Sequence, residues 1–188
     1  MNLKNGMATA IVALAALCQP VFAGGAPAGS VAKGCDEINR GNYTSAISIL
    51  SAAIRQNPSD LDARRYLSSA LIGAGMAREA AQQLEAIAKV APGNAADCTM
   101  MAEAYNQMGD NKIATARYKQ AILLDPAASA PRLGLARLFM ASGDLNGAIS
   151  LCNESLKTRR DAQSRQQFID LLGTIRARSG ITHRQLNG

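Results

Sequence analysis

The chain has 188 residues, a formal net charge of +6 and a single histidine, His183. Catalysis by proton transfer usually needs a group that titrates near neutrality, and no packed site can orient a histidine in so polar a tail. The sequence also lacks a His-Glu-x-x-His zinc pair, a Cys-x-x-Cys pair and a Gly-x-x-x-x-Gly-Lys-Ser/Thr phosphate loop. We therefore expect no catalytic residue, no cofactor and no metal site, and we expect the protein not to be an enzyme.

Residues 1–23 have the order of a secretory signal peptide. Lys4 gives a basic start, an apolar run extends from Met7 to Leu17, and Ala23 provides a small residue for cleavage. The run of about 11 residues is too short to cross a bilayer as a helix. We expect export to the bacterial periplasm or secretion, with residues 24–29 forming a flexible linker.

A lipid anchor on Cys18 is an alternative, because a lipoprotein signal also places a cysteine after an apolar run. The residue before such a cysteine is normally Gly, Ala or Ser, and here it is Leu17. Lipid anchoring is therefore disfavoured. Since no other long apolar stretch follows, we expect the mature protein to be soluble.

Beyond the linker, three residue types recur at one interval. Glycines, the alanines five residues after them, and prolines each repeat every 34 residues. The positions are Gly41, Gly75, Gly109 and Gly143, then Ala46, Ala80, Ala114 and Ala148, and finally Pro58, Pro92 and Pro126. Self-similarity with this period is typical of a solenoid of stacked helix-turn-helix units.

Each interval predicts two helices joined by a turn. Between a proline and the next glycine the apolar residues have a helical period, as from Leu61 to Ala74. Gly75 and Gly109 should lie just past the helix end, because glycine tolerates the left-handed conformation found there. A second helix follows, over Ala77 to Ala91 or Asn111 to Leu124, and a proline prevents its continuation. The early alanine lets the two helices approach closely.

These residues resemble the tetratricopeptide repeat. The third unit matches best, through Met101, Ala102, Tyr105, Gly109, Ala114, Tyr118, Ala121 and Pro126. The resemblance implies an all-α fold, a right-handed α-solenoid over residues 30–162, with about four repeats at 30–60, 61–94, 95–128 and 129–162. The first repeat is atypical, since Lys33 and Glu37 stand where apolar residues are expected. A terminal unit has no neighbour to cover it, so this departure is expected.

Residues 163–178 are predicted to form a capping helix. Phe168, Leu171, Leu172 and Ile175 have helical spacing there. Asp161 is a suitable N-cap, because its carboxylate can accept from the first free amides. Residues 179–188 are predicted to form a basic polar tail.

The net positive charge of the mature chain is confined to its C-terminal end. Residues 24–156 carry 12 basic and 12 acidic side chains, whereas residues 157–188 carry 7 basic and 2 acidic ones. Such an end could make weak contact with an anionic membrane surface or an acidic partner. An accessory role in cell-envelope assembly or secretion would follow from that contact. Alternatively, the charges belong to a solvated cap that keeps the solenoid soluble.

The resemblance also implies a binding surface. In proteins of this family the first helices of successive repeats line a concave groove that holds a protein or peptide. The matching positions are Arg65, Ser69, Ile72, Thr99, Glu103, Asn106, Gln107, Leu133, Arg137 and Met140. This mixture suits a peptide with both polar and apolar side chains. Nucleic acid is not expected as a partner, because the groove is not uniformly basic and aromatic residues are few.

Cys35, Cys98 and Cys152 remain in the mature chain. An odd number at irregular spacing does not suggest a disulfide framework. We expect them to be small buried hydrophobic residues. The leading interpretation is thus an exported scaffold for a partner protein, and its oligomeric state stays open.

Overall fold

The computed structural model describes residues 29–158 and 161–179, and the regular structure in these ranges is entirely α-helical. The helices are α2 (Ser30–Asn39), α3 (Tyr43–Gln56), α4 (Leu61–Gly73), α5 (Ala77–Val90), α6 (Ala95–Gln107), α7 (Asn111–Leu124), α8 (Ala130–Ser142), α9 (Leu145–Thr158) and α10 (Ala162–Ser179). The predicted signal peptide, residues 1–23, lies outside the described residues. So do linker residues 24–28 and tail residues 180–188.

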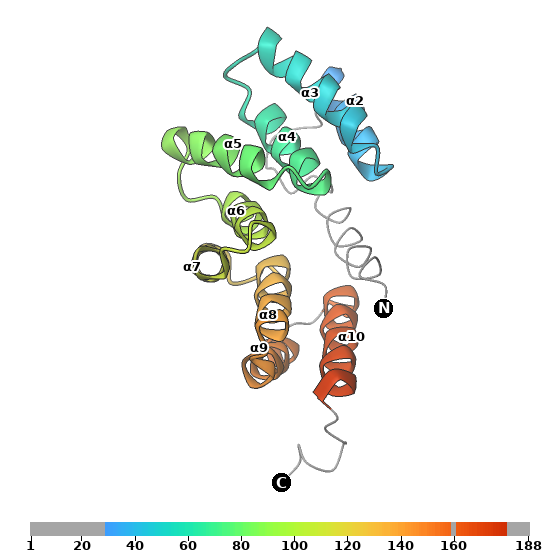
Figure 1. The fold of residues 1–188 in the computed structure, drawn as a ribbon, viewed down its shortest axis with the longest axis vertical. Helices are drawn as coiled ribbons and strands as arrows, with labels where there is room; N and C mark the ends of the chain where they lie inside the picture. Colours follow the sequence, from blue (N-terminus) through green and yellow to red (C-terminus); the bar gives the residue numbers. More distant parts are fainter. Residues whose placement is uncertain (1–28, 159–160, 180–188) are drawn as a thin grey trace.

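The helices form hairpins that stack in chain order, from α2–α3 at one end to α8–α9 and then α10 at the other (Figure 1). The turn inside a hairpin depends on a glycine with positive φ, +78° at Gly75. Its amide donates to the carbonyl of Ile72 at 3.0 Å, and the amide of Met76 donates to that of Leu71 at 2.8 Å. This pattern satisfies carbonyls at the end of α4 and requires the left-handed residue that glycine supplies. The predicted helix end is confirmed.

Several helices begin at a side-chain cap. The carboxylate of Asp60 accepts from the amide of Ala63 at 2.9 Å, and Asp110 caps α7 in the same way. At α10 the amide of Ser164 donates to Asp161 at 2.7 Å, as the sequence predicts. The helix itself is one residue longer at each end than the predicted capping helix, residues 163–178.

The repeating alanines lie where the two helices of a hairpin meet. Ala46, Ala80, Ala114 and Ala148 are each 0% exposed. Buried apolar residues form three clusters, over α2 to α6, over α6 to α8, and over α8 to α10. Neighbouring clusters share a helix, so the core is a band along the stack and each hairpin is stabilised by its neighbours.

A tyrosine ring lies against a glycine at two junctions between hairpins. Tyr43 of α3 covers Gly73 of α4, and Tyr118 of α7 covers Gly134 of α8. A methyl group added at either glycine would overlap the ring. Each glycine therefore lets the backbone of its helix lie in direct contact with the tyrosine ring of the preceding helix.

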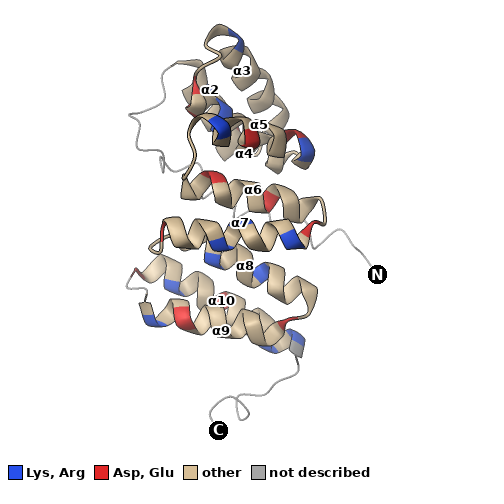
Figure 2. Ribbon diagram, turned by 90° about the vertical axis from the view of Figure 1, so that its left-hand side faces the viewer, with Lys and Arg blue, Asp and Glu red and all other residues tan. Residues whose placement is uncertain are grey.

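The stack curves because its two sides pack differently. The first helices contact one another in order, α2 with α4, α4 with α6, α6 with α8, and α8 with α10, whereas successive second helices have few contacts. The first helices therefore form the inner, concave face. Figure 2 shows the layers from the side, with acidic and basic residues interspersed along them. Within the described ranges, no helix combines the length and hydropathy that a bilayer span requires.

Candidate binding groove

The inner face is formed by α4, α6 and α8, and the structure places all ten predicted groove residues on these helices. They divide into three groups by exposure. Asn106, Gln107 and Arg137 are exposed, whereas Arg65, Glu103 and Met140 are partly buried. The side chains that are least accessible are Ser69, Ile72, Thr99 and Leu133, which are 1–6% exposed. The accessible part of the predicted groove thus lies on α6 and α8.

Arg65 is held by two aspartates. Its Nε and Nη2 donate to the two carboxylate oxygens of Asp97 at 2.8 and 3.0 Å, and its Nη1 donates to Asp62 at 2.9 Å. The side chains of Arg65 and Asp97 are only 11% and 5% exposed. This bidentate pair joins α4 to α6 across the boundary between two hairpins. Arg65 therefore holds the stack together and presents little charge to a ligand.

Asp97 is the important residue that sequence reasoning missed. It follows Arg65 by 32 residues, close to the repeat interval, so the two lie on adjacent first helices. Opposite charges at nearly equivalent positions of neighbouring repeats are a signal that could have identified this pair.

A second bond joins the same two helices at their other end. Gln107 Nε2 donates to the backbone carbonyl of Ile72 at 3.1 Å. Thr99 donates instead within its own helix, to the carbonyl of Ala95 at 2.8 Å. Gln107 remains exposed, but its amide nitrogen already contributes to the contact between α4 and α6.

Glu103 and Ser69 lie between these two cross-links. They occupy equivalent positions, 34 residues apart, on α6 and α4. Glu103 Oε2 and Ser69 Oγ are both shielded from solvent, and neither has a hydrogen-bond partner in the described part of the chain. Burial raises the pKa of the Glu103 carboxyl from 4.5 to about 7, while the positive charge of Arg137 opposes this rise. The middle of the seam thus holds an acid whose charge is poorly stabilised.

Replacing Glu103 with glutamine should remove a pH-dependent loss of stability. Because the folded pKa lies above the unfolded value, the folded protein keeps a proton between pH 4.5 and about 7 that the unfolded chain releases. Stability is therefore lost as the pH rises through this window. The shift corresponds to roughly 3 kcal/mol, and partial solvent access reduces the expected penalty to about 2 kcal/mol.

Urea unfolding of both proteins across this range measures the effect. The free energies of unfolding should be similar near pH 4, and the Glu103→Gln variant should be more stable by about 2 kcal/mol near pH 8. The charged or titratable side chains that interact with this carboxyl are Arg137 on α8 and Tyr118 on α7, and both proteins contain them. A difference that does not change with pH would contradict the assignment.

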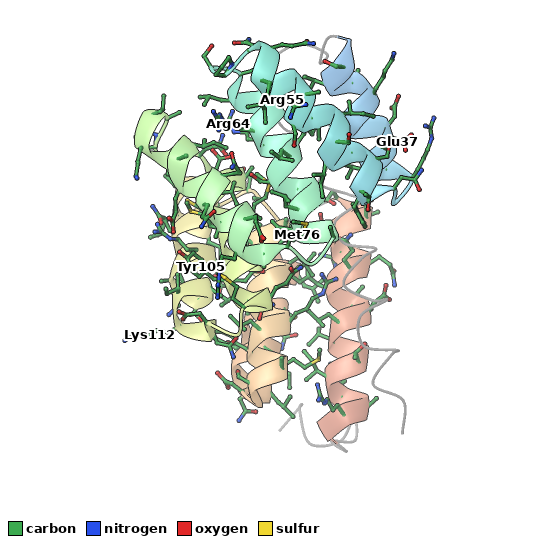
Figure 3. The ribbon with its side chains drawn as sticks, turned by 45° about the horizontal axis from the view of Figure 1, so that its top comes forward. Glu37, Arg55, Arg64, Met76, Tyr105 and Lys112 are labelled. Atoms are coloured by element: carbon green, nitrogen blue, oxygen red, sulfur yellow. The ribbon has the colours of Figure 1, made fainter. Side chains whose placement is uncertain are left out.

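The outer side of α6 and α7 carries a separate open hollow. It is lined by Tyr105, Asp110, Lys112, Ile113, Ala116, Arg117 and Gln120. Tyr105 donates its hydroxyl to Glu85 Oε1 at 2.5 Å, which ties α6 to α5. In Figure 3, Tyr105 and Lys112 lie on the opposite side of the stack from α10. This hollow was not predicted, and none of its lining residues is among the ten predicted groove residues.

The three described cysteines form no disulfide with one another. Cys98 and Cys152 are buried, as expected, whereas Cys35 is partly exposed. Burial raises the pKa of the Cys152 thiol to about 11, so the thiolate is suppressed at neutral pH. Across residues 29–158 and 161–179, no group of three His, Cys, Asp or Glu side chains is arranged to hold a metal ion.

Comparison with known proteins agrees with this geometry. Residues 38–103 and 105–168 match the family model described as tetratricopeptide repeat. A thermophilic TPR protein in Thermus thermophilus superposes with a TM-score of 0.70 at 17% identity, over 80% of this chain and 81% of that chain. MamA from Desulfovibrio magneticus RS-1 gives a TM-score of 0.58 at 18% identity, over 77% and 75%. These two structures support the fold alone.

One curated relative shows similarity in sequence. Cellulose synthase operon protein C of Pseudomonas fluorescens (strain SBW25) is 27% identical over 164 residues. The match covers 83% of this chain but only 12% of the relative. The chain therefore spans about an eighth of that protein's length.

Proposed function

This chain belongs to the tetratricopeptide repeat family, and we propose that it is an exported scaffold whose concave face holds a partner protein or peptide. Proteins of this family generally mediate protein–protein interactions. The family fold is typically a scaffold without catalytic activity.

The accessible side chains of α6 and α8 carry the proposal. Asn106 and Arg137 are exposed on adjacent helices of the inner face, and Met140 is partly buried there. Asparagine can both donate to and accept from a peptide backbone, arginine supplies charge, and methionine adapts to varied apolar surfaces. Because Arg65 is already bound to Asp97 and Asp62, binding is assigned to this part of the groove.

Export rests on the N-terminal sequence. Residues 1–23 combine Lys4, a short apolar run and Ala23 in the order of a signal peptide. The proposed location is the periplasm or the exterior of a bacterial cell. The name of the Pseudomonas relative agrees with a partner in a polysaccharide-synthesising assembly, and this idea is tested with the capture experiment below.

The experiment compares two triple variants in crosslinking capture from an envelope extract, followed by mass spectrometry. The first variant, Asn106→Ala/Arg137→Ala/Met140→Ala, alters the inner face. The matched control, Gln82→Ala/Lys119→Ala/Leu123→Ala, changes similar side chains that are exposed on the second helices α5 and α7. We expect the inner-face variant to reduce recovery of the partner by about tenfold or more, because a few central contacts dominate binding energy. The control should retain it.

Equal recovery with both variants would contradict binding in the groove. If recovery depended instead on the basic end of the chain, the alternative role at an anionic membrane surface would replace the scaffold role. Arg176 and Arg178 lie in the last turn of α10 and supply part of that charge. The control should melt like the wild type, because its three side chains are exposed. The inner-face variant should stay folded but melt slightly lower, because Met140 packs against the core cluster of α8 to α10 and Arg137 offsets the charge of Glu103.

A further inference from the structure

The open hollow on the outer side of α6 and α7 is accessible to a partner. Its volume is about 560 Å³, within the range of roughly 300–1,000 Å³ that is usual for ligand sites. Tyr105, Ile113 and Arg117 form a partly buried floor, and Ala116 and Lys112 belong to its exposed lining. Lys112 lies at the edge of the stack, on the same side as Tyr105 (Figure 3). An incoming side chain can therefore reach both the floor and the cations of the hollow.

The two cations of the hollow have no acidic partner. Neither Lys112 nor Arg117 forms an ion pair in the part of the chain that the structure describes. Arg117 donates from Nη1 to the neutral Oε1 of Gln120 at 3.0 Å, and its Nε and Nη2 have no partner among the described residues. These two groups form one edge of the guanidinium and can bind both oxygens of a carboxylate.

The acidic residues near the hollow are engaged elsewhere. The carboxylate of Asp110 caps α7 by accepting from the amide of Ile113 at 3.1 Å. Glu85 of α5 accepts from the hydroxyl of Tyr105. The sequence of α7 itself contains three basic residues and no acidic one. The positive charge of the hollow is therefore available to an anion from outside the chain.

Packing of the repeats does not require this pair of cations. The residues 34 positions earlier, on α5, are Arg78 and Gln83, and Gln83 accepts from Arg64 of α4 at 3.0 Å. The residues 34 positions later, on α9, are Asn146 and Leu151. A lysine and an arginine together thus occur at these positions on α7 but not on α5 or α9, although all three helices occupy the same place in their hairpins.

We propose that the hollow is a second docking site, separate from the concave face, for an acidic segment of a partner protein. A glutamate or aspartate of the segment pairs with Lys112 and Arg117. A neighbouring apolar side chain contacts Tyr105 and Ile113. The site extends the molecule's binding surface beyond the proposed groove, and a segment can occupy it whether or not the inner face is filled.

The test selects short peptides from a random phage-displayed library against the purified protein, after removal of phage that bind Lys112→Gln/Arg117→Gln. We expect the remaining peptides to share a glutamate or aspartate beside an apolar residue. The double variant should melt like the wild type, because Lys112 is exposed and Arg117 bonds within its own helix. Recovery of no peptide, or of peptides without a shared acid, would overturn the proposal.

A matched control removes the same charge from another second helix. Arg78→Gln/Lys89→Gln loses two exposed cations of α5. It should bind a selected, fluorescently labelled peptide within about twofold of the wild type, whereas Lys112→Gln/Arg117→Gln should bind it about tenfold or more weakly. Ala116→Glu keeps both cations but adds an acid to the exposed lining, so it should also weaken binding. Equal affinities for all four proteins would contradict docking in the hollow.

The peptide itself provides the second half of the test. Replacing its shared acid with the corresponding amide should weaken binding to the wild type by about tenfold or more and binding to Lys112→Gln/Arg117→Gln by less than about twofold. Equal losses would overturn the proposal. Loss of the peptide from Asn106→Ala/Arg137→Ala/Met140→Ala would place its site in the groove, which contradicts the second site and leaves the proposed function intact. Self-association that disappears in Lys112→Gln/Arg117→Gln, measured by sedimentation velocity, would identify the occupant as a second copy of the chain and would also overturn the proposal.

Discussion

Replacing Arg65 with methionine should lower the free energy of unfolding by about 3–5 kcal/mol. The substitution keeps a long apolar stem but leaves the carboxylate of Asp97, only 5% exposed, without its bidentate partner. An unpaired buried charge loses its solvation without any compensating attraction. Urea unfolding followed by far-UV circular dichroism at neutral pH measures the loss.

Two further variants separate the charge from the packing. Arg78 is exposed on α5, so Arg78→Met should change stability by no more than about 0.5 kcal/mol. The double variant Arg65→Met/Asp97→Leu should recover most of the loss, because removing both charges of a buried pair costs much less than removing one. A double variant as unstable as the single one would show that Arg65 acts through packing alone.

Replacing Phe168 with alanine should cost a similar amount, about 3–5 kcal/mol. Phe168 of α10 is 0% exposed and packs in a cluster with Leu133, Cys152 and Ile175. Truncation of the ring leaves a cavity at the end of the stack, where α10 packs against α8 and α9 among the described helices. Local unfolding should therefore concentrate in α10, and hydrogen exchange of its amides should accelerate more than exchange in α4 or α5.

The neighbouring residue provides the control. Ile169 lies on the same helix but is 47% exposed, so Ile169→Ala should cost no more than about 1 kcal/mol. Equal losses for the two substitutions would contradict the docking of α10 through Phe168. A loss spread evenly over all amides would show that the stack unfolds as one cooperative unit, without independent fraying of its end.

The architecture could be predicted because its determinants are local and periodic. Gly75 ends α4, Ala80 permits close approach of α5, and Pro92 follows the end of α5. Each of these effects depends on the residue type and its immediate neighbours in the chain. The 34-residue period then places the same residue types at equivalent points of successive hairpins. The N-cap at Asp161 was predictable for the same reason.

The pairing and the exposure of the groove residues depend on side chains from other helices. The repeat pattern places Arg65 and Arg137 on the inner face, but it does not show that Arg65 is bound by Asp97 while Arg137 is exposed. It also identifies Glu103 as acidic without showing that its Oε2 lacks a partner. Pairing and burial are properties of the assembled seam, so they required the structure.

The tyrosine–glycine contacts have a consequence for the shape of the superhelix. Tyr43 against Gly73 and Tyr118 against Gly134 set how closely a second helix approaches the next first helix. A bulkier residue at either glycine would tilt every later hairpin relative to the earlier ones, because the hairpins are joined in series. Small rotations at these junctions would add up along the superhelix and change its pitch. The width available to a bound segment is thus governed from within the stack, by residues that the segment need not touch.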